Sequence, residues 1–178
     1  SGPVAAADAP ANAAATTSAG AVAPDAEKLF KAIVKVQVRA VPDARSSASL
    51  GTEREGTGIV IGEDNLIVTI GYLIVEADTV TLTDRRGRSL PAQVVGYDHP
   101  TGLGLLRSVV PLDATPVALG EPGRLARRES VLVVTHEGPD EVTLAQVASR
   151  RLFTANWEYL LEQAIFTSPP VLNWSGAA

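Results

Sequence analysis

The sequence predicts an all-β fold, either a β-sandwich or a pair of β-barrels, and two observations support this class. About ten short runs of β-branched and aliphatic residues follow one another along the chain, with little helical pattern between them. Turn-forming Gly, Pro and Asp residues separate these runs at regular spacing. We therefore expect short antiparallel strands throughout the folded part of the chain.

The folded part is predicted to begin near residue 25. Residues 1–24 are almost all small, and Asp8 is their only charge. Such a segment has too little to bury to offset the entropy of ordering, so we predict a flexible leader over residues 1–24 and one folded domain over residues 25–178. Asp25 is expected to cap a short helix. Because Ala- and Pro-rich leaders often follow a cleaved export signal, we expect a periplasmic or otherwise exported protein.

The first half of the domain shows the clearest strand pattern. Val34, Val36 and Val38 alternate with polar residues, which is typical of a half-buried strand. Further strands of this half are expected at 56–61, 66–70, 79–83, 92–97 and 103–109. The second half alternates less regularly, and there the expected strands are 117–119, 130–135, 142–153 and 164–168.

Composition excludes several classes of function. The formal charge of −5 and the pI near 5.0 disfavour sequence-independent nucleic-acid binding, which requires a basic surface. The absence of cysteine excludes disulfides and thiol catalysis, and two histidines among scattered carboxylates offer no convincing metal-ligand set. No apolar run reaches the roughly 18 residues of a membrane-spanning helix. We therefore expect no cofactor, no metal, no nucleic acid and no membrane span.

The order of motifs adds a family resemblance. The segments 56–61, 66–69, 76–82 and 87–98 resemble, in sequence and spacing, the first half of trypsin-like serine proteases of the HtrA/Deg group. The resemblance implies two perpendicular six-stranded antiparallel barrels with the active site in the cleft between them. The first barrel would cover about residues 30–112, and the second would cover about residues 116–178.

The resemblance also implies where a Ser-His-Asp triad would stand, and two of the three positions are altered. Tyr72 occupies the histidine position after the strand 66–70, and Gly102 occupies the aspartate position after Thr101. Ser175 remains at the nucleophile position. A phenol with an unperturbed pKa of about 10 is a poor general base at neutral pH, so the chain resembles a degenerate protease.

The surroundings of Ser175 depart from the family pattern as well. The family carries Gly-Asn-Ser-Gly-Gly, whereas this chain has Asn173, Trp174 and then Ser175 followed by Gly176 and Ala177. Asn173 stands at the oxyanion-hole position, where a glycine normally permits the required backbone turn. Trp174 is expected to lie at the cleft, where it either plugs the substrate site or packs elsewhere.

These features lead to competing functional hypotheses. The first is a pseudoprotease that binds a peptide or a protein partner. The second is a serine endopeptidase or esterase in which Tyr72 or a nearby histidine, His99 or His136, activates Ser175. The third is a purely structural domain.

Two further features of the sequence bear on partners and on processing. The arginines of residues 124–128 and 150–151 form local basic clusters in an acidic chain; surface charge is the simpler interpretation, and an acidic partner is the alternative. Only three residues follow Ser175, and the chain contains no methionine, so we expect a processed or trimmed piece. Its second barrel would be incomplete at the C-terminus and completed by a C-terminal segment of the same protein.

Overall fold

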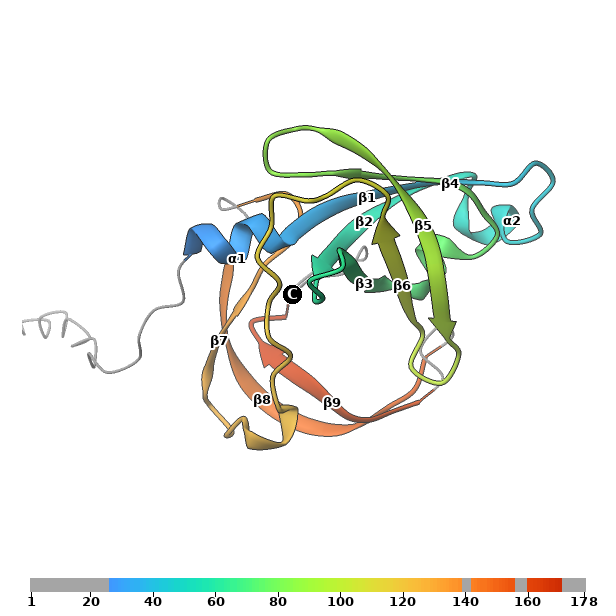
Figure 1. Ribbon diagram of the computed structural model, residues 1–178. Helices are drawn as coiled ribbons and strands as arrows, with labels where there is room; N and C mark the ends of the chain where they lie inside the picture. The colour runs from blue at the N-terminus through green and yellow to red at the C-terminus, as the bar shows by residue number, and fades with distance from the viewer. Residues whose placement is uncertain (1–25, 139–141, 156–159, 171–178) are drawn as a thin grey trace, which may run out of the picture.

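The chain folds into a closed barrel of six antiparallel strands and a separate three-stranded sheet, in a computed structural model that describes residues 26–138, 142–155 and 160–170 (Figure 1). The barrel order is β1-β2-β3-β6-β5-β4, and the second sheet has the order β7-β8-β9. The barrel strands are β1 Ile33–Ala40, β2 Glu53–Val60, β3 Leu66–Ile70, β4 Ala77–Thr83, β5 Ser89–Asp98 and β6 Leu103–Ser108; the sheet comprises β7 Ser130–Val133, β8 Thr143–Phe153 and β9 Leu161–Ser168.

Period-two alternation explains the barrel core. Val34, Val36 and Val38 of β1 point inward and are at most 1% exposed, as the sequence pattern predicts. They meet Ile67, Leu82 and Leu106 from other strands, which are fully buried. Because both neighbours of each barrel strand are strands of the same barrel, the described part of this sheet has no open edge.

Helical elements fill the connections. The helix α1 (Ala26–Ala32) leads into β1, as expected, whereas the short helix α2 (Ser47–Leu50) and the 3₁₀ helix η1 (Gly71–Ile74) were not predicted. A second 3₁₀ helix, η2 (Pro122–Arg124), precedes β7. None of the helices in the described ranges is long and apolar enough to cross a membrane.

The strand expected at residues 117–119 is wrong. This segment belongs to the connection that crosses from β6 to η2 and makes no ladder (Figure 1). Val117 donates one backbone hydrogen bond to the carbonyl of Val60 at 3.0 Å, and its side chain packs against the barrel core. The apolar residue Val117 therefore reflects packing of a linker and not strand pairing, whereas Leu119 is 75% exposed.

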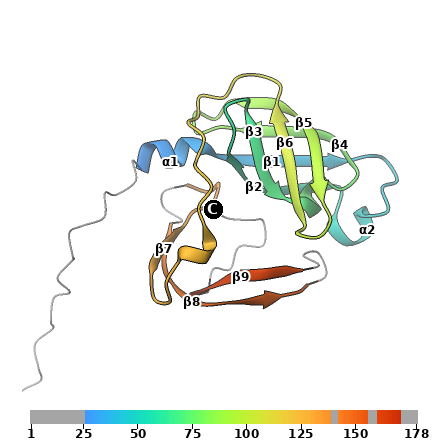
Figure 2. The ribbon, with the colours of Figure 1, turned by 60° about the horizontal axis from the view of Figure 1, so that its bottom comes forward.

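The second sheet represents an incomplete second barrel. Within the described residues, β7 and β9 each pair only with β8. Leu132 and Leu144 are directly opposed on β7 and β8, and they are 48% and 66% exposed. The sheet lies beneath the barrel, with β9 on the barrel side (Figure 2).

Two barrel glycines provide a matched test of the packing. A Cβ at Gly58 would lie 2.8 Å from side-chain methyl carbons of Ile67 and Val36, inside the barrel, whereas a Cβ at Gly96 would meet nothing within 4 Å. Gly58→Ala should lower the free energy of unfolding by about 1–3 kcal/mol through overpacking. Gly96→Ala should leave it within about 0.5 kcal/mol of the parent. Urea denaturation of both variants measures this, and equal losses would contradict the packing described.

Candidate active site

The turn that carries Tyr72 lies directly against the turn that carries Gly102. The N–H of Gly71 donates a hydrogen bond to the carbonyl of Gly102 at 2.7 Å. A Cβ at Gly71 would stand 2.6 Å from this carbonyl oxygen and 2.3 Å from the ring of Tyr97, so the close approach requires glycine. The barrel therefore brings residues 72 and 102 together, although they are distant in the sequence.

The Gly102 position has no side chain and a backbone that disfavours one. Its φ of 70° lies in the left-handed region, and its N–H donates to the carbonyl of Asp98 at 2.8 Å. Asp98 closes the same turn by accepting hydrogen bonds from the N–H and the hydroxyl of Thr101. The carboxylate of Asp98 thus stabilises the turn through its hydrogen bonds with Thr101. An aspartate side chain at residue 102 would strain this backbone.

Tyr72 is half-buried and packs against the barrel core from η1. The end of η1 is held by Arg54, whose side chain is buried although it is charged. The Nη1 group of Arg54 donates to the carbonyls of Tyr72 at 3.1 Å and Val75 at 2.5 Å, and its Nε donates to the carbonyl of Gly51 at 3.1 Å. Burial lowers the pKa of the Arg54 guanidinium. One side chain therefore satisfies the free carbonyls at the end of this turn.

Glu76 fixes the neighbouring loop to the same turn. Its carboxylate accepts hydrogen bonds from the hydroxyl of Ser46 at 2.6 Å and from the N–H groups of Ser46 and Arg45 at 2.8 and 3.3 Å. The Ser46 hydroxyl also accepts from Nη2 of Arg54 at 2.7 Å. These hydrogen bonds, with that of the Ser46 hydroxyl first, lower the pKa of Glu76. Arg54, Ser46 and Glu76 therefore form one polar network behind the Tyr72 turn.

A second polar network joins the barrel to the second sheet at His136. The Nδ1 atom of His136 lies 3.0 Å from the Thr57 hydroxyl, its backbone N–H donates to the same hydroxyl at 3.2 Å, and its Nε2 lies 3.5 Å from Glu55. The Thr57 hydroxyl therefore contacts both the ring and the backbone of His136, and the other ring nitrogen faces Glu55. Lys35 pairs with Glu55 at 2.8 Å, and its hydrogen bond lowers the pKa of Glu55.

A cleft of about 460 Å³ lies between the Gly102 turn and the second sheet. Pro100 and Thr101 form one wall, and residues 160–164 at the start of β9 form the other. The N–H of Leu160 donates to the carbonyl of Pro100 at 3.1 Å, which connects the two walls. The lining is mainly apolar, as is usual for sites that bind peptides or small ligands.

The remaining candidates fall into two groups. Asn173, Trp174 and Ser175 lie outside the described residues. His99 is exposed in the turn before Gly102 and contacts the ring of Tyr97, with 4.7 Å between ring centroids. His136 is 7% exposed at its side chain and contributes to the junction described above. Within the described ranges, no group of three or more potential ligands could hold a metal ion.

Sequence reasoning missed Arg54 as a residue of this region. The sequence contained a signal for this role. Alternate residues of a strand face the same side, so Arg54 faces inward with Gly56, Gly58 and Val60 of β2. An arginine on the inner face of a strand needs several acceptors. This pattern could have predicted that Arg54 reaches carbonyl groups at the end of the barrel.

Comparisons with known proteins agree with this geometry. A family model described as the trypsin-like peptidase domain matches residues 56–174. The serine protease PepD of Mycobacterium tuberculosis is 30% identical over 145 residues, covering 75% of this chain and 29% of PepD.

Among solved structures, the HtrA-type protease AlgW with tripeptide has a TM-score of 0.58 and 15% identity, covering 73% of this chain and 40% of that chain. A structure of an AlgW variant with tripeptide has a TM-score of 0.61 and 16% identity, covering 78% and 43%. These two likenesses concern the fold. The chain spans less than half the length of each of these relatives.

Arg54→Met tests the network behind the Tyr72 turn. The variant keeps much of the side-chain volume but removes the Arg54 hydrogen bonds to the part-buried carbonyls of Tyr72 and Val75, so the free energy of unfolding should fall by about 2–4 kcal/mol. Arg39→Met, on exposed β1 surface, is the matched control and should change stability by less than about 0.5 kcal/mol. Urea denaturation gives both values. An Arg54→Met protein as stable as the control would show that Arg54 does not hold this turn.

Glu76→Gln tests the loop contact through its pH dependence. The pKa of Glu76 is lower in the folded chain than in the unfolded chain, so its carboxylate stabilises the fold above the unfolded value of about 4.5. This stabilisation is lost as the pH falls through the folded pKa. Thermal unfolding between pH 7 and pH 3 should show that Glu76→Gln is less stable than the parent at pH 7 and loses less stability below about pH 4.5. Asp78→Asn, a change at an exposed neighbour, is the control and should show the same dependence of stability on pH as the parent. A curve for Glu76→Gln that runs parallel to that of the parent would refute the role of Glu76.

Proposed function

We propose that this chain, which belongs to the family of trypsin-like peptidase domains, is a catalytically impaired member that binds peptide segments. In the family's triad, a histidine takes the serine proton and an aspartate orients the histidine. The resemblance assigns Tyr72 and Gly102 to these two positions. The impairment concerns the general base and its orienting group, while the barrel that carries both positions is intact.

The contact between the Tyr72 and Gly102 turns is the observation that supports impairment most strongly. The hydrogen bond from the Gly71 N–H to the Gly102 carbonyl, at 2.7 Å, brings the turns of Tyr72 and Gly102 together. The two altered triad positions therefore lie at one place in the fold. A half-buried phenol and a side-chain-free glycine supply neither a base near neutral pH nor a carboxylate to orient one. Removal of triad members leaves about 10³–10⁴-fold catalysis over water in proteases with an intact oxyanion hole.

Peptide binding is supported by the cleft beside the Gly102 turn. Its apolar walls come from the barrel and from β9, as expected for a site between two halves of a fold. The solved AlgW structures, which share this fold, contain a tripeptide. We propose that a peptide segment of a partner protein occupies this cleft.

We also propose that a C-terminal segment of the same protein completes the second sheet. Within the described part of the chain, both β7 and β9 offer unpaired edges, and Leu132 and Leu144 present apolar surface beside one of them. Edges of this kind are generally paired or covered in folded proteins. Added strands would pair with these edges and cover the leucines.

Labelling of the full-length protein with a fluorophosphonate probe tests the impairment. We expect less than about 1% labelling under conditions that label an active serine protease completely, because the probe requires an activated serine. Ser175→Ala should behave as the parent does. In parallel, a labelled peptide library should bind to the protein and be recovered uncleaved.

Stoichiometric labelling that is lost in Ser175→Ala would overturn the proposal and favour the alternative, a serine hydrolase with a reorganised base. The variants Tyr72→Phe and His99→Ala would then identify that base, since loss of hydrolysis in only one of them assigns the role. Failure of every peptide to bind would overturn the peptide-binding part of the proposal.

A further inference from the structure

The arginines of the two basic clusters, residues 124–128 and 150–151, differ in whether they already have partners within the protein. Arg124 pairs with Glu121 at 2.7 Å. Arg151 lies over the ring of Phe166, with its guanidinium carbon 4.1 Å from the ring centroid. These two side chains are therefore already engaged within the protein.

Arg127 and Arg150, one from each cluster, line the same hollow. This hollow has a volume of about 700 Å³ and lies between the segment before β7 and the strands β8 and β9. The other polar side chains in its lining are Ser149 and Gln163, and none of its lining residues is acidic. All four polar side chains can donate hydrogen bonds, and two of them are positively charged.

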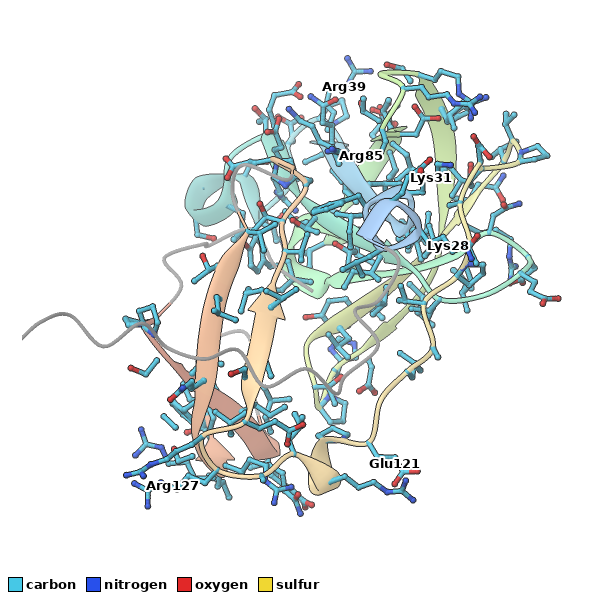
Figure 3. The ribbon with its side chains drawn as sticks, turned by 90° about the vertical axis from the view of Figure 1, so that its left-hand side faces the viewer. Lys28, Lys31, Arg39, Arg85, Glu121 and Arg127 are labelled. Carbon is cyan, nitrogen blue, oxygen red and sulfur yellow. The ribbon has the colours of Figure 1, made fainter. Side chains whose placement is uncertain are left out.

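The two arginines differ in how they are held. Arg150 donates from Nη1 to the carbonyl of Pro122 at 2.7 Å, which anchors its guanidinium beside η2. Arg127 is exposed, and within the described ranges it makes no ion pair. Figure 3 shows it at the end of the molecule far from Lys28 and Lys31 of α1, so this basic site is separate from the lysines of that helix. One arginine is thus fixed, and the other is available to a ligand.

We propose that this hollow binds an acidic segment of a partner protein, with a carboxylate facing Arg127 and Arg150. Guanidinium groups bind carboxylates through paired, charge-assisted hydrogen bonds. The hollow is much larger than one carboxylate, and Leu125 and Val147 add apolar lining. The matching ligand is therefore a peptide in which acidic residues stand next to an aliphatic residue.

Charge complementarity favours a peptide over nucleic acid. The whole chain has a formal charge of −5, so the two arginines form a small local basic site in an acidic protein. Nucleic-acid binding depends on many phosphate contacts along an extended basic surface. The hollow is independent of Tyr72 and Gly102, so this inference does not rest on the impaired catalytic site.

Fluorescence anisotropy of the full-length protein tests the proposal. The probe is a fluorescein-labelled peptide of alternating Glu-Glu and Leu, and a Lys-Lys and Leu peptide is the control ligand. Arg127→Gln should raise the Kd of the acidic peptide about tenfold, and Arg127→Lys should restore part of the affinity. Arg124→Gln, an arginine of the same cluster that is paired with Glu121, should leave the Kd within about twofold of the parent. Higher salt should weaken binding of the parent.

Several results would overturn the proposal. These are equal affinity of Arg127→Gln and the parent, equal binding of the basic peptide, or tighter binding of a single-stranded oligonucleotide of matching length. Absence of binding by the parent would also overturn it. Circular dichroism of each variant confirms that the fold is retained, as expected for the exposed Arg127 side chain.

Discussion

The buried guanidinium of Arg54 is the interaction on which the shape of the candidate site depends. A 3₁₀ turn ends in carbonyl groups that have no partner within the turn, and here the chain must leave that turn for β4 at once. Arg54 supplies the missing donors from β2. Since an arginine remains charged and offers five N–H groups, it can serve Ser46 and Gly51 at the same time. The position of Tyr72 is therefore set by a strand distant in the sequence.

The scaffold and the chemistry of this site are separable. The closed barrel, the Gly71–Gly102 hydrogen bond and the networks of Arg54 and Glu76 are structural, and none of them requires a histidine or an aspartate at residues 72 and 102. A fold does not by itself specify a reaction, because the reaction depends on the side chains placed on it. A domain that keeps the geometry and replaces the titrating groups can retain a binding cleft, since the walls of the cleft come from the scaffold.

The sequence predicted the strands better than it predicted the contacts. The alternation of apolar and polar residues located the barrel strands because successive side chains of a strand point to opposite faces and only the inner face of the barrel is apolar. The segment 117–119 misled because Val117, in a linker, packs on the barrel core and needs to be apolar without belonging to a strand. Residues 72 and 102 were placed by the resemblance, and the hydrogen bond between Gly71 and Gly102 agrees with their proximity. The contact of Thr57 with His136 spans 79 residues and two sheets, and no local pattern encodes it.

The junction at His136 explains how such a cleft keeps its shape. Its contacts are directional: the Thr57 hydroxyl lies 3.0 Å from Nδ1 of His136, and Glu55, which is held by Lys35, lies 3.5 Å from Nε2. Apolar packing alone would let the sheet slide along the barrel, whereas directional hydrogen bonds define one relative position. Thr57 also accepts a hydrogen bond at its carbonyl from the Thr69 hydroxyl at 2.8 Å, two residues before Gly71. The same short stretch of β2 therefore contacts both His136, which follows β7 of the second sheet, and the strand that leads to Tyr72.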